Sequence, residues 1–128
     1  MKRIGIISDT HSYWDPKYLH YFEPCDEIWH AGDIGNVDVL IKHIGGYPGN
    51  YDHSIVRTLY TNPPQLFIAG HSHILKVKYD ATLKMLHINP GAAGLQGWHK
   101  ERTLVRLTID GFAFKDLEVI TLEDPRRQ

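Results

Sequence analysis

The sequence contains a single cysteine, Cys25, so the chain cannot form an internal disulfide or a zinc site built from cysteines alone. It also lacks a basic excess: 14 Lys and Arg against 15 Asp and Glu give a formal net charge of −1. Such a balance provides no positive field for nucleic acid, and we expect no nucleic-acid partner. No apolar run approaches the length of a membrane span, so we expect no membrane partner.

Several motifs of common enzyme classes are missing as well. The chain has no glycine-rich dinucleotide fingerprint, no P-loop and no His-Glu-x-x-His zinc motif. The segment 70–74 superficially resembles the nucleophile elbow of serine hydrolases, but Ile74 stands where the second glycine belongs. The chemistry therefore has to be sought in other residues.

The length and composition are those of one ordinary globular domain. The chain has 128 residues, of which 42% are hydrophobic and 23% charged, so we expect residues 1–128 to form a single soluble domain. The first eleven residues have a basic start and only a short apolar stretch, which predicts a buried strand rather than a secretion signal. A cytoplasmic location is the resulting expectation.

Apolar runs and turn residues predict the order of the elements. We expect strands over 3–7, 27–30, 37–42 and 65–69, and hairpins pairing 75–79 with 84–88 and 103–109 with 112–120. Helices are expected over 16–22, with Asp15 as N-cap and Pro16 as first residue, and over 54–60. Residues 45–50 have the composition of a loop. Helix and strand alternate first and strands follow, a pattern that predicts an α/β sandwich.

The unusual feature of the composition is nine histidines, several of which follow a predicted strand directly. Open α/β sheets place their ligands at the carboxyl ends of strands. In an extended segment, residues two apart point the same way, so Asp-x-His and His-x-His can each direct two ligands at one ion. These strand ends carry the residues Asp9, His11, Asp33, His43, His71 and His73.

Each cluster alone is better explained by a turn, a cap or a solvated loop, and only their coincidence at successive strand ends indicates a metal site. Carboxylate and imidazole ligands without thiolate suit manganese, iron, zinc or nickel. A site this rich in ligands could hold two ions, the usual arrangement for phosphoester hydrolysis. The remaining histidines lack this setting: His30 is interpreted as structural, and surface or packing roles are expected for His20, His53, His87 and His99.

The ordered ligand set, together with the turn Asn89-Pro90-Gly91-Ala92, resembles the calcineurin-like metallophosphoesterases, above all their small single-domain prokaryotic phosphodiesterases. The resemblance runs through nearly the whole chain. It implies a sandwich of two sheets flanked by helices and a binuclear metal centre, with manganese as first choice and zinc, iron or nickel as alternatives. It also implies hydrolysis of a small phosphoester, mainly a phosphodiester, by a metal-bound hydroxide.

The resemblance also implies a role for each ligand. Asp9, His11 and His73 would hold the first metal, Asp33 would bridge the two ions, and His43 and His71 would hold the second. Asp33 and His43 would thus form part of the catalytic centre. Substrate-binding residues are not implied, although Tyr13, Trp14, Tyr47 or Tyr51 could line the opening.

The chain departs from the family between Asp33 and His43. The family carries a Gly-Asn segment there whose asparagine completes the second metal site, and a helix and strand are missing. A strand over 37–42 spans ~20 Å at about 3.3 Å per residue. The four steps from Asp33 to Val37 reach only about 14 Å, and a parallel crossover needs about a dozen residues or more.

This short connection leaves several interpretations open. In the first, the chain lacks a segment of the native protein. In the second, the strand is shorter, displaced or swapped between subunits. In the third, the second metal site is broken. The main alternative function is a non-catalytic scaffold, because the retromer scaffold subunit resembles these enzymes in fold. A mononuclear metalloenzyme using Asp9, His11, Asp33 and His73 is a third hypothesis. A homodimer is expected from the edge that a truncated sandwich would expose.

Overall fold

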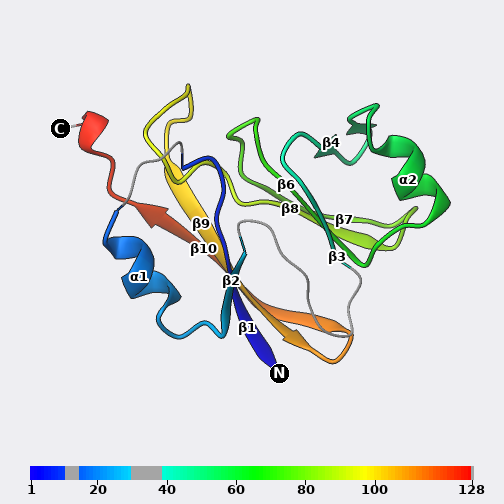
Figure 1. Ribbon diagram of the computed structural model, residues 1–128, viewed down its shortest axis with the longest axis horizontal. Coiled ribbons are helices and arrows are strands. Elements are labelled where there is room, and N and C mark those ends of the chain that lie inside the picture. The colour runs from blue at the N-terminus through cyan, green and yellow to red at the C-terminus, as the bar shows by residue number, and fades with distance from the viewer. Residues whose placement is uncertain (11–14, 30–38, 128) are drawn as a thin grey trace.

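The computed structural model describes residues 1–10, 15–29 and 39–127, and two four-stranded sheets dominate it (Figure 1). The first sheet has the order β10-β9-β1-β2. Strands β1 (Lys2–Ile6) and β2 (Glu27–Trp29) are parallel, whereas β9 (Arg102–Asp110) runs antiparallel to β1 and forms a hairpin with β10 (Ala113–Leu122).

The second sheet has the order β3-β6-β8-β7. Strands β3 (Val39–Lys42), β6 (Leu66–Ala69) and β8 (Met85–Asn89) are mutually parallel, and β7 (Lys76–Asp80) pairs antiparallel with β8. The carboxyl ends of three successive parallel strands therefore meet at one edge of this sheet. The chain at that edge continues directly into His43, Gly70 and Pro90.

The hydrophobic core lies between the sheets, and the helices lie outside. Ile4, Ile6 and Leu107 of the first sheet pack against Leu66 and Ile88 of the second. Helix α1 (Lys17–Phe22) covers the outer face of the first sheet, and α2 (Val56–Thr61) covers the outer face of the second (Figure 1). The predicted sandwich flanked by helices is thus confirmed.

Local predictions hold with small shifts. Both hairpins form, and α1 begins at Lys17 rather than Pro16, although the Asp15 carboxylate accepts a hydrogen bond from the Lys17 amide as a capping residue does. The prediction of a loop over 45–50 was wrong. Strands β4 (Gly46–Tyr47) and β5 (Asn50–Tyr51) form a tight hairpin there, because Gly49 adopts the positive φ angle that the two-residue turn between them requires.

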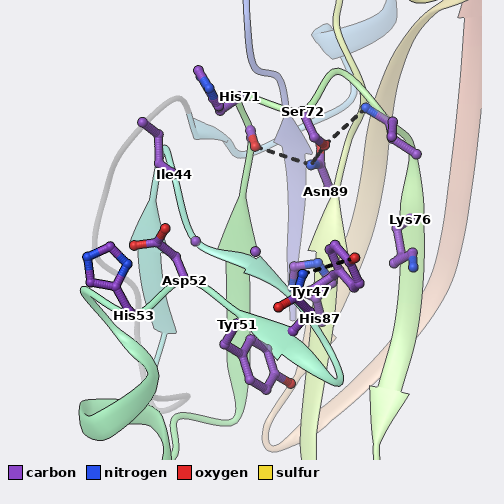
Figure 2. A pocket seen from close by; sticks show the side chains of 15 residues that line it. Ile44, Tyr47, Tyr51, Asp52, His53, His71, Ser72, Lys76, His87 and Asn89 are labelled. Atoms are coloured by element: carbon purple, nitrogen blue, oxygen red, sulfur yellow. Dashed lines mark hydrogen bonds between the residues drawn. The ribbon is translucent and has the colours of Figure 1, made fainter.

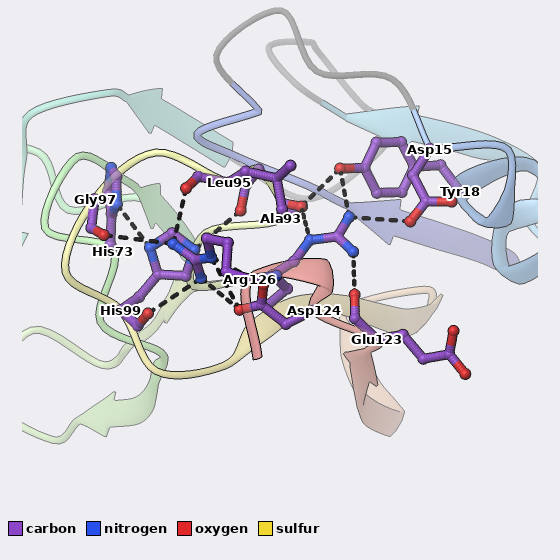
Figure 3. A network of polar contacts seen from close by, with 12 residues as sticks. Asp15, Tyr18, His73, Ala93, Leu95, Gly97, His99, Glu123, Asp124 and Arg126 are labelled. Carbon is purple, nitrogen blue, oxygen red and sulfur yellow. Dashed lines mark hydrogen bonds and ion pairs between the residues drawn. The ribbon is translucent and has the colours of Figure 1, made fainter. Parts of the chain in front are cut away.

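The C-terminal segment is tied to the rest of the fold by a buried arginine. After β10 the chain forms the short 3₁₀-helix η1 (Pro125–Arg127). The Arg102 guanidinium, only 1% exposed, donates to the carbonyls of Ala93 and Glu123, to the Asp15 carboxylate and to the Tyr18 hydroxyl (Figure 3). One side chain thereby connects α1, the loop after β8 and the segment after β10.

Two predictions concern membrane crossing and the short connection after Asp33. The helices within the described residues are too short and too polar to cross a membrane. Residues 33–38, where the family segment is missing, lie outside the described part of the chain, so the interpretations of that short connection stay predictions. The single-domain assignment of residues 1–128 also stays a prediction.

His87 on β8 is an unusual component of the outer face of the second sheet. It has no exposed surface, its ring packs on Phe67 with the centroids 5.4 Å apart, and neither ring nitrogen has a hydrogen-bond partner among the described residues. Burial lowers the pKa of His87 from 6.5 to about 4, and the nearby backbone of Phe67 opposes only part of this effect.

We predict that His87 makes the protein sensitive to mild acid. Between pH 6.5 and about 4 the unfolded chain binds a proton at His87 that the folded chain does not, so the free energy of unfolding falls as the pH is lowered. A pKa shift of this size corresponds to about 3 kcal/mol. Urea unfolding of the wild type and of His87→Leu at several pH values measures the difference; parallel pH profiles for the two proteins would contradict the prediction.

Candidate metal centre

The candidate site lies where β1 of the first sheet and β3 and β6 of the second end side by side. Asp9 follows β1, His43 follows β3, and His71 and His73 follow β6. The β3–β6 pairing continues past both strands, since the Gly70 amide donates to the His43 carbonyl at 2.9 Å. These four predicted ligands, far apart in the sequence, are therefore neighbours in space.

Asp9 is at the centre of this group. Its side chain is fully buried, and its carboxylate accepts hydrogen bonds from the Ser8 hydroxyl at 2.6 Å and from the His71 amide at 3.0 Å and 3.2 Å. Nε2 of His43 lies 3.5 Å from Asp9 Oδ1, and Nε2 of His73 lies 3.4 Å from the same oxygen. One carboxylate oxygen thus faces two imidazole nitrogens.

The histidines differ in exposure. The His43 side chain is 56% exposed and meets the His71 ring edge-on, with the centroids 5.3 Å apart. The His73 side chain is only 14% exposed, and its ring also contacts His99. The group therefore has one buried wall, formed by Asp9 and His73, and one open side at His43 and His71.

The backbone at these residues is itself unusual. Asp9, His71 and His73 have φ angles of 55°, 69° and 64°, in the left-handed region. Residues other than glycine pay about 1–2 kcal/mol for this conformation, although Asp and His tolerate it better than most. Such strain persists where surrounding contacts impose it and is concentrated at functional sites. The three left-handed residues all lie in the loops that follow β1 and β6.

Small residues and one amide hold the loop after β6 against Asp9. A methyl group on Gly70 would lie 2.2 Å from Ser8 Oγ and 2.8 Å from Asp9 Oδ2, so only glycine fits there. The buried Asn89 side chain, in the predicted Asn-Pro-Gly-Ala turn, donates to Ser72 Oγ and to the Gly70 carbonyl. It also accepts from the Gly91 amide, which closes the turn.

One histidine that we expected on the surface or in packing lies against this group instead. Nδ1 of His99 is 3.1 Å from Nδ1 of His73, and Nε2 of His99 is 3.0 Å from the Gly94 carbonyl (Figure 3). The packing expected for His99 thus takes the form of a polar ring contact with a predicted ligand. No sequence spacing indicates this contact, because the loop after β8 brings His99 to the site from 26 residues away.

The donor set fits a divalent cation. Asp9 is a buried carboxylate, and the basic groups next to it within the described residues are the imidazoles of His43 and His73, with no Lys or Arg. A buried carboxylate requires a compensating positive charge, and carboxylate oxygen with imidazole nitrogen suits manganese, zinc, iron or nickel. His11 and Asp33 lie outside the described residues, and the described residues alone contain no group of three or more His, Cys, Asp or Glu side chains that could hold a metal ion.

A cavity of about 660 Å³ opens beside this group. It runs from His71, Ser72 and Asn89 along the outer face of the second sheet, beneath the β4–β5 hairpin (Figure 2). Tyr47 and Lys76 form part of its wall, with the Lys76 ammonium 4.5 Å from the centre of the Tyr47 ring. The volume is that of a typical small-molecule site.

The sequence profile of the calcineurin-like phosphoesterase superfamily domain matches this chain over residues 1–44 and 34–111. The chain belongs to this superfamily. The profile matches in two overlapping stretches, and the overlap falls on the short connection between Asp33 and His43. No curated protein sequence matches the chain.

Solved structures of phosphoesterase-fold proteins resemble the chain closely in fold and weakly in sequence. A predicted phosphoesterase from Streptococcus pneumoniae has a TM-score of 0.62 at 17% identity, covering 94% of this chain and 89% of its own. An archaeal phosphodiesterase has a TM-score of 0.59 at 16% identity, covering 94% and 99%. Wild-type Vps29 from Entamoeba histolytica complexed with zinc has a TM-score of 0.60 at 13% identity, covering 94% of this chain and 98% of its own. At these identities the likeness shows the fold alone.

We predict that Gly70→Ala weakens metal binding. The added methyl group would push Ser8 and Asp9 away from the loop, and a displaced ligand should cost about tenfold or more in affinity. Calorimetric titration with Mn²⁺ measures the change. Gly111→Asn is the control, because a side chain there meets nothing within 4 Å and Asn tolerates the positive φ. Equal affinity of Gly70→Ala and wild type would contradict the role given to Gly70.

Proposed function

We propose that this protein is a metal-dependent phosphodiesterase. The observation that carries the proposal is the buried Asp9 carboxylate facing Nε2 of both His43 and His73 at the strand ends of a phosphoesterase-superfamily fold. Divalent ions, with manganese as first choice, would supply a nucleophilic oxygen at neutral pH and positive charge against the phosphoryl oxygens. The substrate we propose is a small phosphodiester.

The residues divide into a metal-holding group and a supporting group. Asp9 and His73 would hold the first ion together with His11, and His43 and His71 would hold the second together with the bridging Asp33, as predicted from the sequence. Gly70 and Asn89 keep the loop after β6 in place, so that the His71 amide and the His73 ring stay next to Asp9. Positioning of this kind limits the reorganisation required when the phosphoryl group develops charge.

The cavity beside the group supports a diester rather than a monoester. A diester carries two organic groups, so one must be accommodated while the other leaves. The cavity begins at His71 and extends away from Asp9, and Tyr47, which is 44% exposed, offers it an aromatic surface. Ser72 and Asn89 beside His71 are polar, and Tyr47 farther along the cavity is aromatic, so an organic arm would lie against Tyr47.

The scaffold alternative stays open and has a distinct experimental signature. A scaffold would bind its protein partner without metal and would hydrolyse no phosphoester in Mn²⁺ or Ni²⁺. The missing Gly-Asn segment favours this alternative, and the buried, imidazole-faced Asp9 favours the enzyme, because a scaffold has no need of such a carboxylate. Elemental analysis after reconstitution with Mn²⁺ bears on the mononuclear hypothesis, since two ions per chain would exclude it.

We predict that Asp9→Asn lowers phosphodiesterase activity about 100-fold or more, because the amide removes the charge at the centre of the ligand group. The measurement is release of p-nitrophenol from bis(p-nitrophenyl) phosphate in Mn²⁺.

Asp116→Asn is a matched control for this substitution. Asp116 also has a left-handed backbone, with φ of 53°, but it is exposed on β10 of the first sheet and has no contact with the site. We expect it to keep wild-type activity. Undiminished turnover by Asp9→Asn, or the same loss in both variants, would overturn the proposal.

A second prediction concerns the cavity. Tyr47→Ala removes an aromatic wall, so it should raise the inhibition constant of phenyl phosphate about tenfold while leaving that of inorganic phosphate unchanged. Tyr79→Ala is the control, since Tyr79 is similarly exposed on β7 but does not line this cavity. If Tyr47→Ala altered both inhibitors equally, the organic arm would not lie in this cavity.

A further inference from the structure

The contact between His73 and His99 determines which nitrogen of each ring carries a proton. A carbonyl oxygen can only accept a hydrogen bond, so His99 Nε2, 3.0 Å from the Gly94 carbonyl, has to be the donor. In a neutral His99 ring, Nδ1 is then an acceptor. Nδ1 of His73, 3.1 Å away, therefore has to carry the proton that this acceptor receives.

In a neutral His73 ring, this order of protons leaves Nε2 without a hydrogen. That nitrogen lies 3.4 Å from Asp9 Oδ1, so a lone pair of the imidazole faces a carboxylate oxygen that is also an acceptor. Two acceptors at this distance repel each other unless a cation lies close to both. The chain Gly94–His99–His73 thus prepares Nε2 of His73 as a metal ligand before any ion binds.

The loop that carries His99 is itself held in place. The Arg126 guanidinium donates to the carbonyls of Leu95, Gly97 and His99, and Asp124 pairs with it at 2.6 Å (Figure 3). Gly97 packs directly on the ring pair, since a methyl group there would lie 2.2 Å from His73 Nδ1 and 3.2 Å from His99 Nδ1. Arg126 of the C-terminal segment and Gly97 therefore keep the His99 ring in contact with the His73 ring.

We propose that His99 is a positioning residue of the metal centre: by accepting a hydrogen bond from the Nδ1–H of His73, it holds His73 in the tautomer and orientation that bind metal through Nε2. The inference rests on the metal-dependent function proposed above. It is nevertheless tested without turnover, because the tautomer of His73 is a property of the metal-free protein.

The first experiment is long-range ¹H–¹⁵N NMR of histidine-labelled, metal-free full-length chain, with His73 assigned by comparison with His73→Gln. We expect His73 to be protonated at Nδ1 with Nε2 as the bare nitrogen, and His99 to be protonated at Nε2. A His73 ring protonated at Nε2 overturns the inference, whether or not the protein proves to be a phosphodiesterase.

The second experiment compares two substitutions of His99. His99→Asn places an amide oxygen near the position of Nδ1 and keeps an acceptor for His73, whereas His99→Leu removes the acceptor at similar size. We expect His99→Leu to weaken Co²⁺ affinity about 10- to 100-fold and to alter the visible Co²⁺ spectrum, and His99→Asn to stay within about threefold of wild type.

A purely structural role for His99 gives a different pattern. Equal weakening by both variants, or wild-type affinity in His99→Leu, overturns the proposal. Thermal unfolding of the metal-free variants shows whether both are folded, and if His99→Leu is not, the NMR result on the wild type decides. Loss of activity with Co²⁺ affinity and the His73 tautomer intact would count against the proposed hydrolase and not against His99.

Discussion

The hydrogen bond from the His71 amide to the Asp9 carboxylate is the interaction on which the candidate site depends. It joins the end of β1 in the first sheet to the end of β6 in the second, so a single carboxylate bridges the two layers of the sandwich. Since the Asp9 side chain is buried, water does not compete for this hydrogen bond. The bond therefore holds the loop after β1 against the loop after β6. The hydrogen bond fixes the carboxylate, and the imidazoles of His43 and His73 both lie next to its Oδ1 atom.

Close packing of the loops explains why small residues surround this bond. Gly70 lies against Ser8 and Asp9, and Gly94 lies against the backbone of Asp9 and Thr10, where an added methyl group would come within 2.4 Å of the Thr10 carbonyl. The amides of Ala93 and Gly94 continue the contact by donating to the carbonyls of Ser8 and Asp9. The site is thus formed by the backbones of three loops as much as by its side chains.

The support around the site extends further than its ligands. Asn89 ties the loop after β6 to the turn after β8, Arg102 ties that turn to α1, and Arg126 ties the loop of His99 to the C-terminal segment. Each of these side chains forms several hydrogen bonds. They pair with backbone carbonyls or amides of the loops that have no partner in a sheet or helix. The positions of the imidazoles are therefore set by residues that carry no metal-binding chemistry of their own.

The sequence by itself determined the sandwich, its hairpins and the superfamily, because alternation, turn residues and the order of Asp and His are local signals. It also placed Asp9, His43, His71 and His73 directly after strands. The meeting of β1 with the paired strands β3 and β6 puts Asp9 next to His43 and His73. Only the tertiary structure decided that His99 meets His73 and that residues 46–51 form a hairpin over a cavity. It also decided that the ring nitrogens of His87 are buried with no hydrogen-bond partner among the described residues. These features depend on contacts between segments distant in the chain, which leave no period or motif in the sequence.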